Sequence, residues 1–174
     1  EEHPLKDKDS IEIRYMTAKD EDILTNRDLL KKGLAIDRLI SNLIKDKSIN
    51  PEHLYVGDRN AIMIYARTSA YGAEYKTKVN CPNCGEQNKC EFDLTQHEVF
   101  HGNDFDKDSI KITDKSTFEV TLPLSKIKAA IRPLMGFDEL DMIKKSKGKM
   151  LNDLVTQQMK RFVVAFNGYE DQKT

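Results

Sequence analysis

The stretch IEIRYMTAKDED, residues 11–22, carries the pattern from which the rest of the fold can be worked out. Apolar and charged residues alternate from Ile11 to Tyr15, which is the two-residue period of a short β-strand. Thr17 and Asp20 then have the spacing of a capping box, in which a hydroxyl and a carboxylate satisfy N–H groups at a helix start. The stretch therefore predicts a strand, a turn and the acidic first turn of a helix.

A second stretch, AAIRPLMGFDEL at residues 129–140, repeats this pattern. At a constant offset of 118 residues there are four identical pairs: Ile13 and Ile131, Arg14 and Arg132, Asp20 and Asp138, Glu21 and Glu139. We expect each arginine to pair with the nearby carboxylates and to order the junction between strand and helix. Two interpretations stay open: an internal duplication of a strand–helix unit, or a chance match between short sequences.

The remaining periodicities predict mostly helices. They indicate helices over residues 26–45, 59–70, 137–145 and 151–166, a β-hairpin over 75–94, and strands over 118–122 and 127–132. The predicted fold class is α+β: a mainly helical domain with short strands, an inserted CxxC-tipped β-hairpin and the duplication as an open interpretation. We divide the chain into a flexible lead-in (1–10), an N-terminal strand–helix unit (11–72), the CxxC hairpin (73–97) and a C-terminal strand–helix unit (98–174), within one compact domain.

Composition excludes several classes of protein. The 174 residues include 28 Lys and Arg against 29 Asp and Glu, so a protein that binds nucleic acid mainly by neutralising phosphates is not expected. No apolar run has the roughly 18 residues that a membrane span needs. The three cysteines are an odd number, and two of them form a CxxC, which favours a reducing compartment over a disulfide framework.

The segment Cys81-Pro82-Asn83-Cys84-Gly85 is the sharpest local motif. Its shape is that of a zinc knuckle, in which two thiolates project to one side. A structural zinc needs four ligands, and the nearby candidates are Cys90 and the histidines at 97 and 101; we take the set Cys81, Cys84, Cys90 and His97. Cys90 can join only if residues 85–89 loop back, because a plain strand would carry it away. A structural zinc, a metal-free turn with buried thiols and a redox pair all stay open.

No catalytic grouping stands out in the sequence. The acidic clusters at 20–22 and 138–141 coincide with helix starts, where carboxylates sit for structural reasons. The four histidines have no Ser or Asp arrangement of a catalytic triad, and no phosphate-binding loop or dinucleotide fingerprint occurs. We therefore expect no enzyme. The apolar face of the helix predicted at 151–166 is the expected protein contact, with Phe162 and Phe166 as anchors; packing of that face into the core is the alternative.

Several separate blocks occur in an order that resembles one protein family. They are RYMTAKDEDIL at residues 14–24, AIDRL at 35–39, LYVGDRNA at 54–61, YGAEY at 71–75, CPNCG at 81–85, FDL at 92–94 and FEVTLP at 118–123. Together they resemble the baseplate hub assembly proteins of T-even-type bacteriophages. The resemblance covers residues 11–123 well and the last helices loosely.

This resemblance implies a non-enzymatic assembly factor, or a minor structural component, of the baseplate hub of a contractile phage tail. The implied partners are other hub proteins, with no nucleic acid and no membrane span. The implied location is the host cytoplasm during assembly, and the virion baseplate if the chain stays in the particle. The alternative function is a zinc-ribbon-like module that binds nucleic acid. It would need a basic hairpin, whereas three lysines are offset by three glutamates there: Lys76, Lys78 and Lys89 against Glu74, Glu86 and Glu91.

Overall fold

The structure is a computed structural model that describes residues 4–5, 8–96, 110–113, 117–146 and 151–170. Its helices are α1 (Ala18–Thr25), α2 (Arg27–Lys32), α3 (Ala35–Leu43), the short 3₁₀ helix η1 (Pro51–His53), α4 (Val56–Tyr71), α5 (Gly136–Ser146) and α6 (Leu151–Phe162). Its strands are β1 (Glu74–Asn80), β2 (Gln87–Asp93), β3 (Ile110–Ile112), β4 (Phe118–Thr121), β5 (Lys128–Ile131), β6 (Val163–Phe166) and β7 (Tyr169–Glu170). The predicted α+β class is confirmed.

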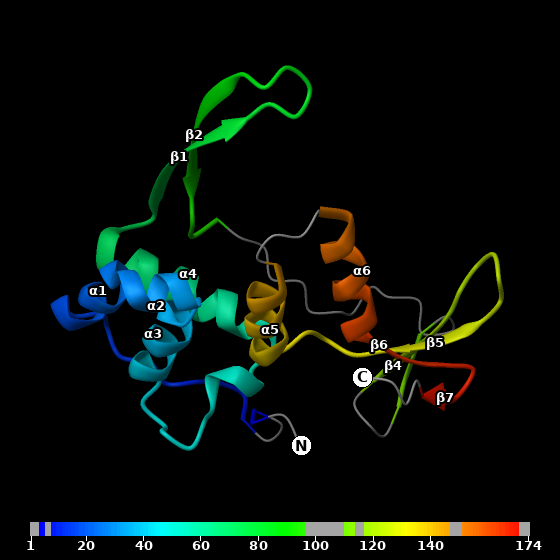
Figure 1. The fold of residues 1–174 in the computed structure, drawn as a ribbon. Coiled ribbons are helices and arrows are strands. Elements are labelled where there is room, and N and C mark those ends of the chain that lie inside the picture. Colours follow the sequence, from blue (N-terminus) through cyan, green and yellow to red (C-terminus); the bar gives the residue numbers. More distant parts are fainter. Residues whose placement is uncertain (1–3, 6–7, 97–109, 114–116, 147–150, 171–174) are drawn as a thin grey trace.

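The strands form two antiparallel sheets that lie apart. β1 and β2 pair along their whole length, from Glu74 opposite Asp93 to Asn80 opposite Gln87. The other five strands form one sheet in the order β3-β4-β5-β6-β7. Helices α1–α4 gather at one side of the molecule, the β1–β2 ribbon projects from the end of α4, and the five-stranded sheet lies at the other side (Figure 1).

The hydrophobic core lies among α3, α4 and the segment between them. Its buried members are Leu39, Ile40, Leu43, Ile44, Ile49, Leu54, Ile62 and Ala66. Four of them, Leu39, Ile40, Leu43 and Ile44, follow the i, i+3, i+4 spacing of one buried helix face along α3 and its end. The core therefore belongs to the N-terminal helices.

The single helix predicted over 26–45 is wrong, because the chain breaks at Gly33. This residue has φ +74°, a left-handed conformation that ends α2 and that glycine adopts without strain. A Cβ here would also lie 2.8 Å from Cγ2 of Ile143 on α5. The break at Gly33 lets α3 turn its apolar face toward α1 and α4.

The predicted end of the last helix is also wrong. α6 stops at Phe162, and Val163–Phe166 form strand β6. β-branched residues favour a pleated strand, and Asn167 (φ +48°) with Gly168 (φ +81°) forms the two-residue turn that leads into β7. Phe166, expected on a helix, therefore lies on a strand.

Two further differences concern the first half of the chain. The strand expected at 11–15 is reduced to a single antiparallel bridge between Ile13 and Ile44. α4 begins at Val56, three residues before the predicted start, and its buried residues are Arg59, Ile62 and Ala66. α4 therefore lies at the surface with one stripe facing the core. Within the described residues, no helix is both long and apolar enough to cross a membrane.

Candidate functional site

The first junction, as we call the contact set around Arg14 and Asp20, ties the segment before α1 to its first turn. The Arg14 guanidinium donates two hydrogen bonds to the Asp20 carboxylate, from Nη1 to Oδ2 (2.7 Å) and from Nη2 to Oδ1 (2.9 Å). The backbone N–H of Thr17 donates to the same Oδ2 (2.9 Å), which is the carboxylate half of the predicted capping box. The Asp20 side chain is fully buried, so the pair holds a charge inside the protein.

The same junction also holds the end of α3. The Arg14 N–H donates to the carbonyl of Leu43, the last residue of α3, at 2.9 Å. Ile13 then forms its bridge with Ile44. One short segment thus connects the start of α1 with the end of α3.

The second junction, around Arg132 and Asp138, repeats these contacts. Arg132 donates from Nη1 to Oδ2 of Asp138 (2.7 Å) and from Nη2 to Oδ1 (2.8 Å). The N–H of Met135 donates to Oδ2 (2.9 Å), as that of Thr17 does in the first junction. Asp138 is also fully buried. The expected pairing of each arginine with the nearby carboxylate is therefore found at both places.

The repeat extends to the following helix pair. The Arg132 N–H donates to the carbonyl of Phe162, the last residue of α6, at 2.8 Å. Ile131 lies opposite Val163 in the sheet. The two junctions thus have the same connections. In each, an arginine in an extended segment binds the carboxylate at the start of the next helix, and its N–H donates to the last residue of a later helix.

The two arginines change the protonation of the buried carboxylates. Hydrogen bonds from Arg14 lower the pKa of Asp20 well below its usual range and outweigh burial, which acts in the opposite direction. Burial raises the pKa of Asp138, but hydrogen bonds from Arg132 and the Met135 N–H outweigh it, and the net pKa is lowered. Both carboxylates are therefore ionised at neutral pH and unsuited to act as general acids.

Arg59 on α4 connects the two parts of the chain. Only 4% of its side chain is exposed, and Nε lies 3.0 Å from Oε2 of Glu139 on α5. Nη1 donates a hydrogen bond to the Pro51 carbonyl at 3.0 Å. It also forms an ion pair with Asp37 on α3, at 2.8 Å from Oδ1, but this contact does not have the geometry of a hydrogen bond. Arg59 is not among the residues predicted from the sequence, although an arginine among the apolar residues of a helix was a signal for it.

Gly136 lets this connection close. A Cβ on it would lie 2.7 Å from Nη1 of Arg59 and 2.8 Å from the carbonyl oxygen of Pro51. The backbones also meet here, because the N–H of Gly136 donates to the Leu54 carbonyl at 3.0 Å. The start of α5 is thus fixed against the chain that precedes α4.

The CxxC segment lies between β1 and β2. The Cys81 N–H donates to the Glu86 carbonyl (2.8 Å), and the Gly85 N–H donates to the Cys81 carbonyl (2.9 Å). The backbone N–H groups of Cys84 and Asn83 point at the Cys81 sulfur and lower the pKa of its thiol. This arrangement favours a thiolate, which is the form that binds a metal.

The register of the ribbon keeps the third cysteine away from this pair. Cys90 lies opposite Thr77, four residues before Cys81, which is about 13 Å along a strand. Two sulfurs on the same zinc lie roughly 4 Å apart. His97 lies outside the described residues, and among the residues described no group of three or more metal-binding side chains occurs. None of the three cysteines forms a disulfide, and Cys84 is exposed.

The five-stranded sheet has one apolar and one polar face. Residues that face each other on neighbouring strands, or that lie two apart on one strand, share a face of a sheet. By this rule the following residues form what we call the apolar sheet face: Ile110, Ile112, Phe118, Val120, Ala129, Ile131, Phe166 and Tyr169. Ala129 in the middle is buried, whereas Ile112, Phe166 and Tyr169 are 66%, 50% and 82% exposed. The edges of this apolar face are therefore open to solvent.

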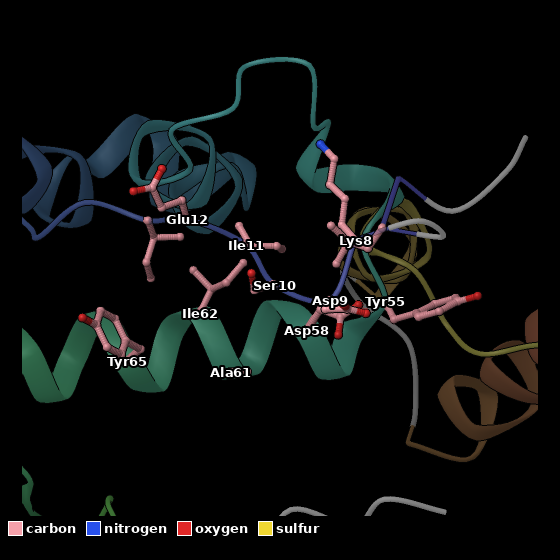
Figure 2. A pocket seen from close by; sticks show the side chains of 12 residues that line it. Lys8, Asp9, Ser10, Ile11, Glu12, Tyr55, Asp58, Ala61, Ile62 and Tyr65 are labelled. Atoms are coloured by element: carbon pink, nitrogen blue, oxygen red, sulfur yellow. The ribbon is translucent and has the colours of Figure 1, made fainter.

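A groove runs between the segment before α1 and helix α4 (Figure 2). It is lined by Leu5, Lys8, Asp9, Ser10, Ile11, Glu12 and Ile13 on one side and by Tyr55, Asp58, Ala61, Ile62 and Tyr65 on the other. Its floor is apolar and three of its four charged residues are acidic. The Tyr65 hydroxyl is hydrogen-bonded to that of Tyr15, which raises the pKa of Tyr65.

These features define a small α+β protein whose buried charges connect structural elements and whose apolar groups are partly exposed. A family model described as T4 bacteriophage base plate protein matches residues 2–157, most of the chain, so the protein belongs to this family. The family indicates a structural or assembly role in a phage baseplate. Searches of curated proteins and of solved structures found no significant match.

Proposed function

We propose that the protein is a non-enzymatic assembly factor or minor structural component of the baseplate hub of a contractile-tailed phage, acting through protein–protein contacts. The observation that carries this proposal is the apolar sheet face in a member of a baseplate family. A protein that works alone rarely leaves such side chains open at both edges of a sheet, because their burial is favourable. Its partners are then other proteins of the hub.

Phe166 is the anchor that we propose on this surface. It is 50% exposed and lies directly opposite Tyr169, which is 82% exposed, so both side chains lie on the same face of the sheet. Phe162 is half-buried at the end of α6, where its carbonyl accepts the Arg132 N–H. We propose Phe162 as the second anchor, at the place where α6 meets the sheet.

Capture of the tagged protein from infected cells tests this function. We expect baseplate proteins to be captured, and Tyr169→Ser to reduce their yield several-fold. Tyr75→Ser is the matched control, because Tyr75 is also exposed but lies on the β1–β2 ribbon. Presence of the chain in purified particles would identify a structural component, and its absence an assembly factor.

Capture of nucleic acid without baseplate proteins would contradict the proposal and support the alternative, a nucleic-acid-binding module. The ribbon offers little to favour that alternative. Lys76 lies 2.6 Å from Glu74 and 3.9 Å from Glu91, so its charge is compensated locally.

We further propose that Cys81 and Cys84 bind a structural zinc. The N–H groups directed at the Cys81 sulfur support this. Elemental analysis of untagged protein should find one zinc, lost in Cys84→Ser and kept in Cys90→Ser. Protein without zinc would leave a metal-free turn or a redox pair.

We also propose that the two junctions descend from an internal duplication. Support comes from the paired contacts: the same arginine–aspartate geometry, and the same bond to the end of a later helix. A chance sequence match would not be expected to carry this set of contacts in three dimensions.

A further inference from the structure

The two junctions differ in one respect that bears on binding. In the second junction, β5 has a neighbour on each edge, β6 on one side and β4 on the other. In the first junction, the described residues give the corresponding segment before α1 a neighbour on one edge, at Ile44. In the second junction, β4 lies on the other edge of β5. In the described part of the chain, no strand lies on the corresponding edge of Ile13.

The hydrogen bonds around Ile13 show which edge this is. Arg14 N–H donates to the Leu43 carbonyl, and Lys45 N–H donates to the Glu12 carbonyl (3.0 Å). These hydrogen bonds are made by the residues next to Ile13 and Ile44 and not by Ile13 and Ile44 themselves. In an antiparallel ladder, this pattern defines a non-hydrogen-bonded pair. The N–H and C=O of Ile13 therefore point to the opposite edge, and along an extended segment those of Ile11 do so too.

These groups have no hydrogen-bond partner among the described residues. Their counterparts in the second junction do have one strand to pair with, because Ile131 lies opposite Phe118 and Ala129 opposite Val120 on β4. Unsatisfied backbone groups at a strand edge are what an added strand pairs with. The first junction thus has the backbone groups for one more strand.

The groove provides the space beside this edge. Both odd and even residues of the segment 8–13 line it, as expected for the edge of a strand rather than for one of its faces. Across the groove, α4 contributes Ala61, Ile62 and Tyr65, and Figure 2 shows the segment crossing over this part of the helix. A strand placed here would have Ile11 and Ile62 beside its apolar side chains.

Charge indicates the chemistry of the occupant. The charged residues of the groove are Asp9, Glu12 and Asp58 against Lys8. Lys8 lies 2.5 Å from Asp46 and Glu12 lies 2.9 Å from Lys45, so each of these two charges has a partner outside the groove. Acidic residues thus outnumber basic ones in the lining of the groove, which favours basic side chains in whatever binds there.

We propose that the groove binds an extended segment of a partner protein, with alternating apolar and basic residues, as an added β-strand along Ile11 and Ile13. This deepens the proposed contact role by naming where a partner segment binds. Because its test uses isolated protein and peptides, its failure would leave the baseplate role standing.

The experiment selects binders of the full chain from a displayed library of ten-residue peptides. The selected peptides are then synthesised, and their affinity is measured by fluorescence anisotropy. We expect alternating apolar and basic sequences, and protection of the Ile11 and Ile13 amides from hydrogen exchange in the complex. Ile11→Pro removes a groove-facing N–H and should weaken binding at least tenfold.

Ser10→Pro is the matched control, because the Ser10 N–H points to the other edge, and binding should persist. Asp9→Lys tests the charge without altering the backbone: it should weaken the basic peptides severalfold, whereas Asp22→Lys should not. Peptides that bind Ile11→Pro as well as the unaltered chain, or that protect amides elsewhere, would overturn the proposal. Concentration-dependent protection of Ile11 and Ile13 without peptide would overturn it in favour of a second copy of the chain.

Discussion

Asp20 and Asp138 are buried carboxylates that each hold an arginine across a strand–helix junction. Replacing either one with alanine leaves a partly exposed guanidinium and a backbone N–H without their acceptor, which costs about 1–3 kcal/mol of unfolding free energy. Asp22→Ala, on the exposed side of α1, should change stability by less than about 0.5 kcal/mol. Urea unfolding of Asp138→Ala and of Asp22→Ala measures the two losses of stability. Equal unfolding midpoints would contradict the structural role of the junction.

The same carboxylates predict how stability depends on pH. Their pKa values are lowered in the folded protein relative to about 3.9 in the unfolded chain. Their contribution is therefore complete at neutral pH and is lost as the pH falls below about 4, toward the folded pKa values. Thermal unfolding between pH 7 and 2 should show this loss. This loss of stability at low pH should be smaller in the double variant Asp20→Asn, Asp138→Asn. An equally large loss in the double variant would contradict the conclusion that these two carboxylates cause it.

Gly136 gives a third test at the scale of single residues. Gly136→Ala places a methyl group against the buried Arg59 guanidinium and a backbone carbonyl, so we expect a loss of roughly 1–3 kcal/mol. Gly57→Ala has open space around it near the start of α4, and there the helix propensity of alanine should keep or raise stability. The unfolding midpoint should therefore fall in Gly136→Ala and stay or rise in Gly57→Ala, and a fall of the same size in both would contradict this account.

The sequence predicts the junctions but not Arg59, for a physical reason. Arg14 and Asp20 are six residues apart, so a local pattern of strand and helix start brings them together. Arg59 contacts Asp37 and Glu139, and the second of these is 80 residues away. Nothing in a local pattern indicates which distant carboxylate a buried arginine will meet.

At the scale of elements, the turn at Asn167 and Gly168 decides where the helical part of the C-terminus ends. Gly168→Ala forces a left-handed conformation on a residue with a Cβ, at a cost of roughly 1–2 kcal/mol. Gly168→Asn should lose less, because asparagine tolerates that conformation. Denaturant unfolding compares them, and equal losses would mean that the turn geometry is not what matters.

Most elements were predictable from periodicity, and the errors have identifiable causes. The apolar spacing of residues 151–166 continues into Val163 and Phe166, so it cannot distinguish a helix from a helix followed by a strand. The Asn-Gly pair was the local signal for the turn. The position of Cys90 depended on the register of β2 against β1, which a single sequence does not reveal.

At the scale of the whole molecule, the family follows from many short blocks in order, whereas the contact surfaces do not. The apolar sheet face is assembled from five strands between residues 110 and 170, and its alternation is visible only once the strands are paired. Val155 and Met159 on α6 are also exposed, at 53% and 52%. The C-terminal part of the chain thus offers more apolar surface than the N-terminal core region.

Hydrogen–deuterium exchange of the chain, free and within the complex captured from infected cells, tests the proposed contact most directly. We predict that binding protects the amides of β6 and β7 around Phe166 and Tyr169, with further protection at Ile11 and Ile13 if a partner strand fills the groove. Protection confined to other elements, or capture without any baseplate protein, would contradict the conclusion that this protein works through its apolar sheet face.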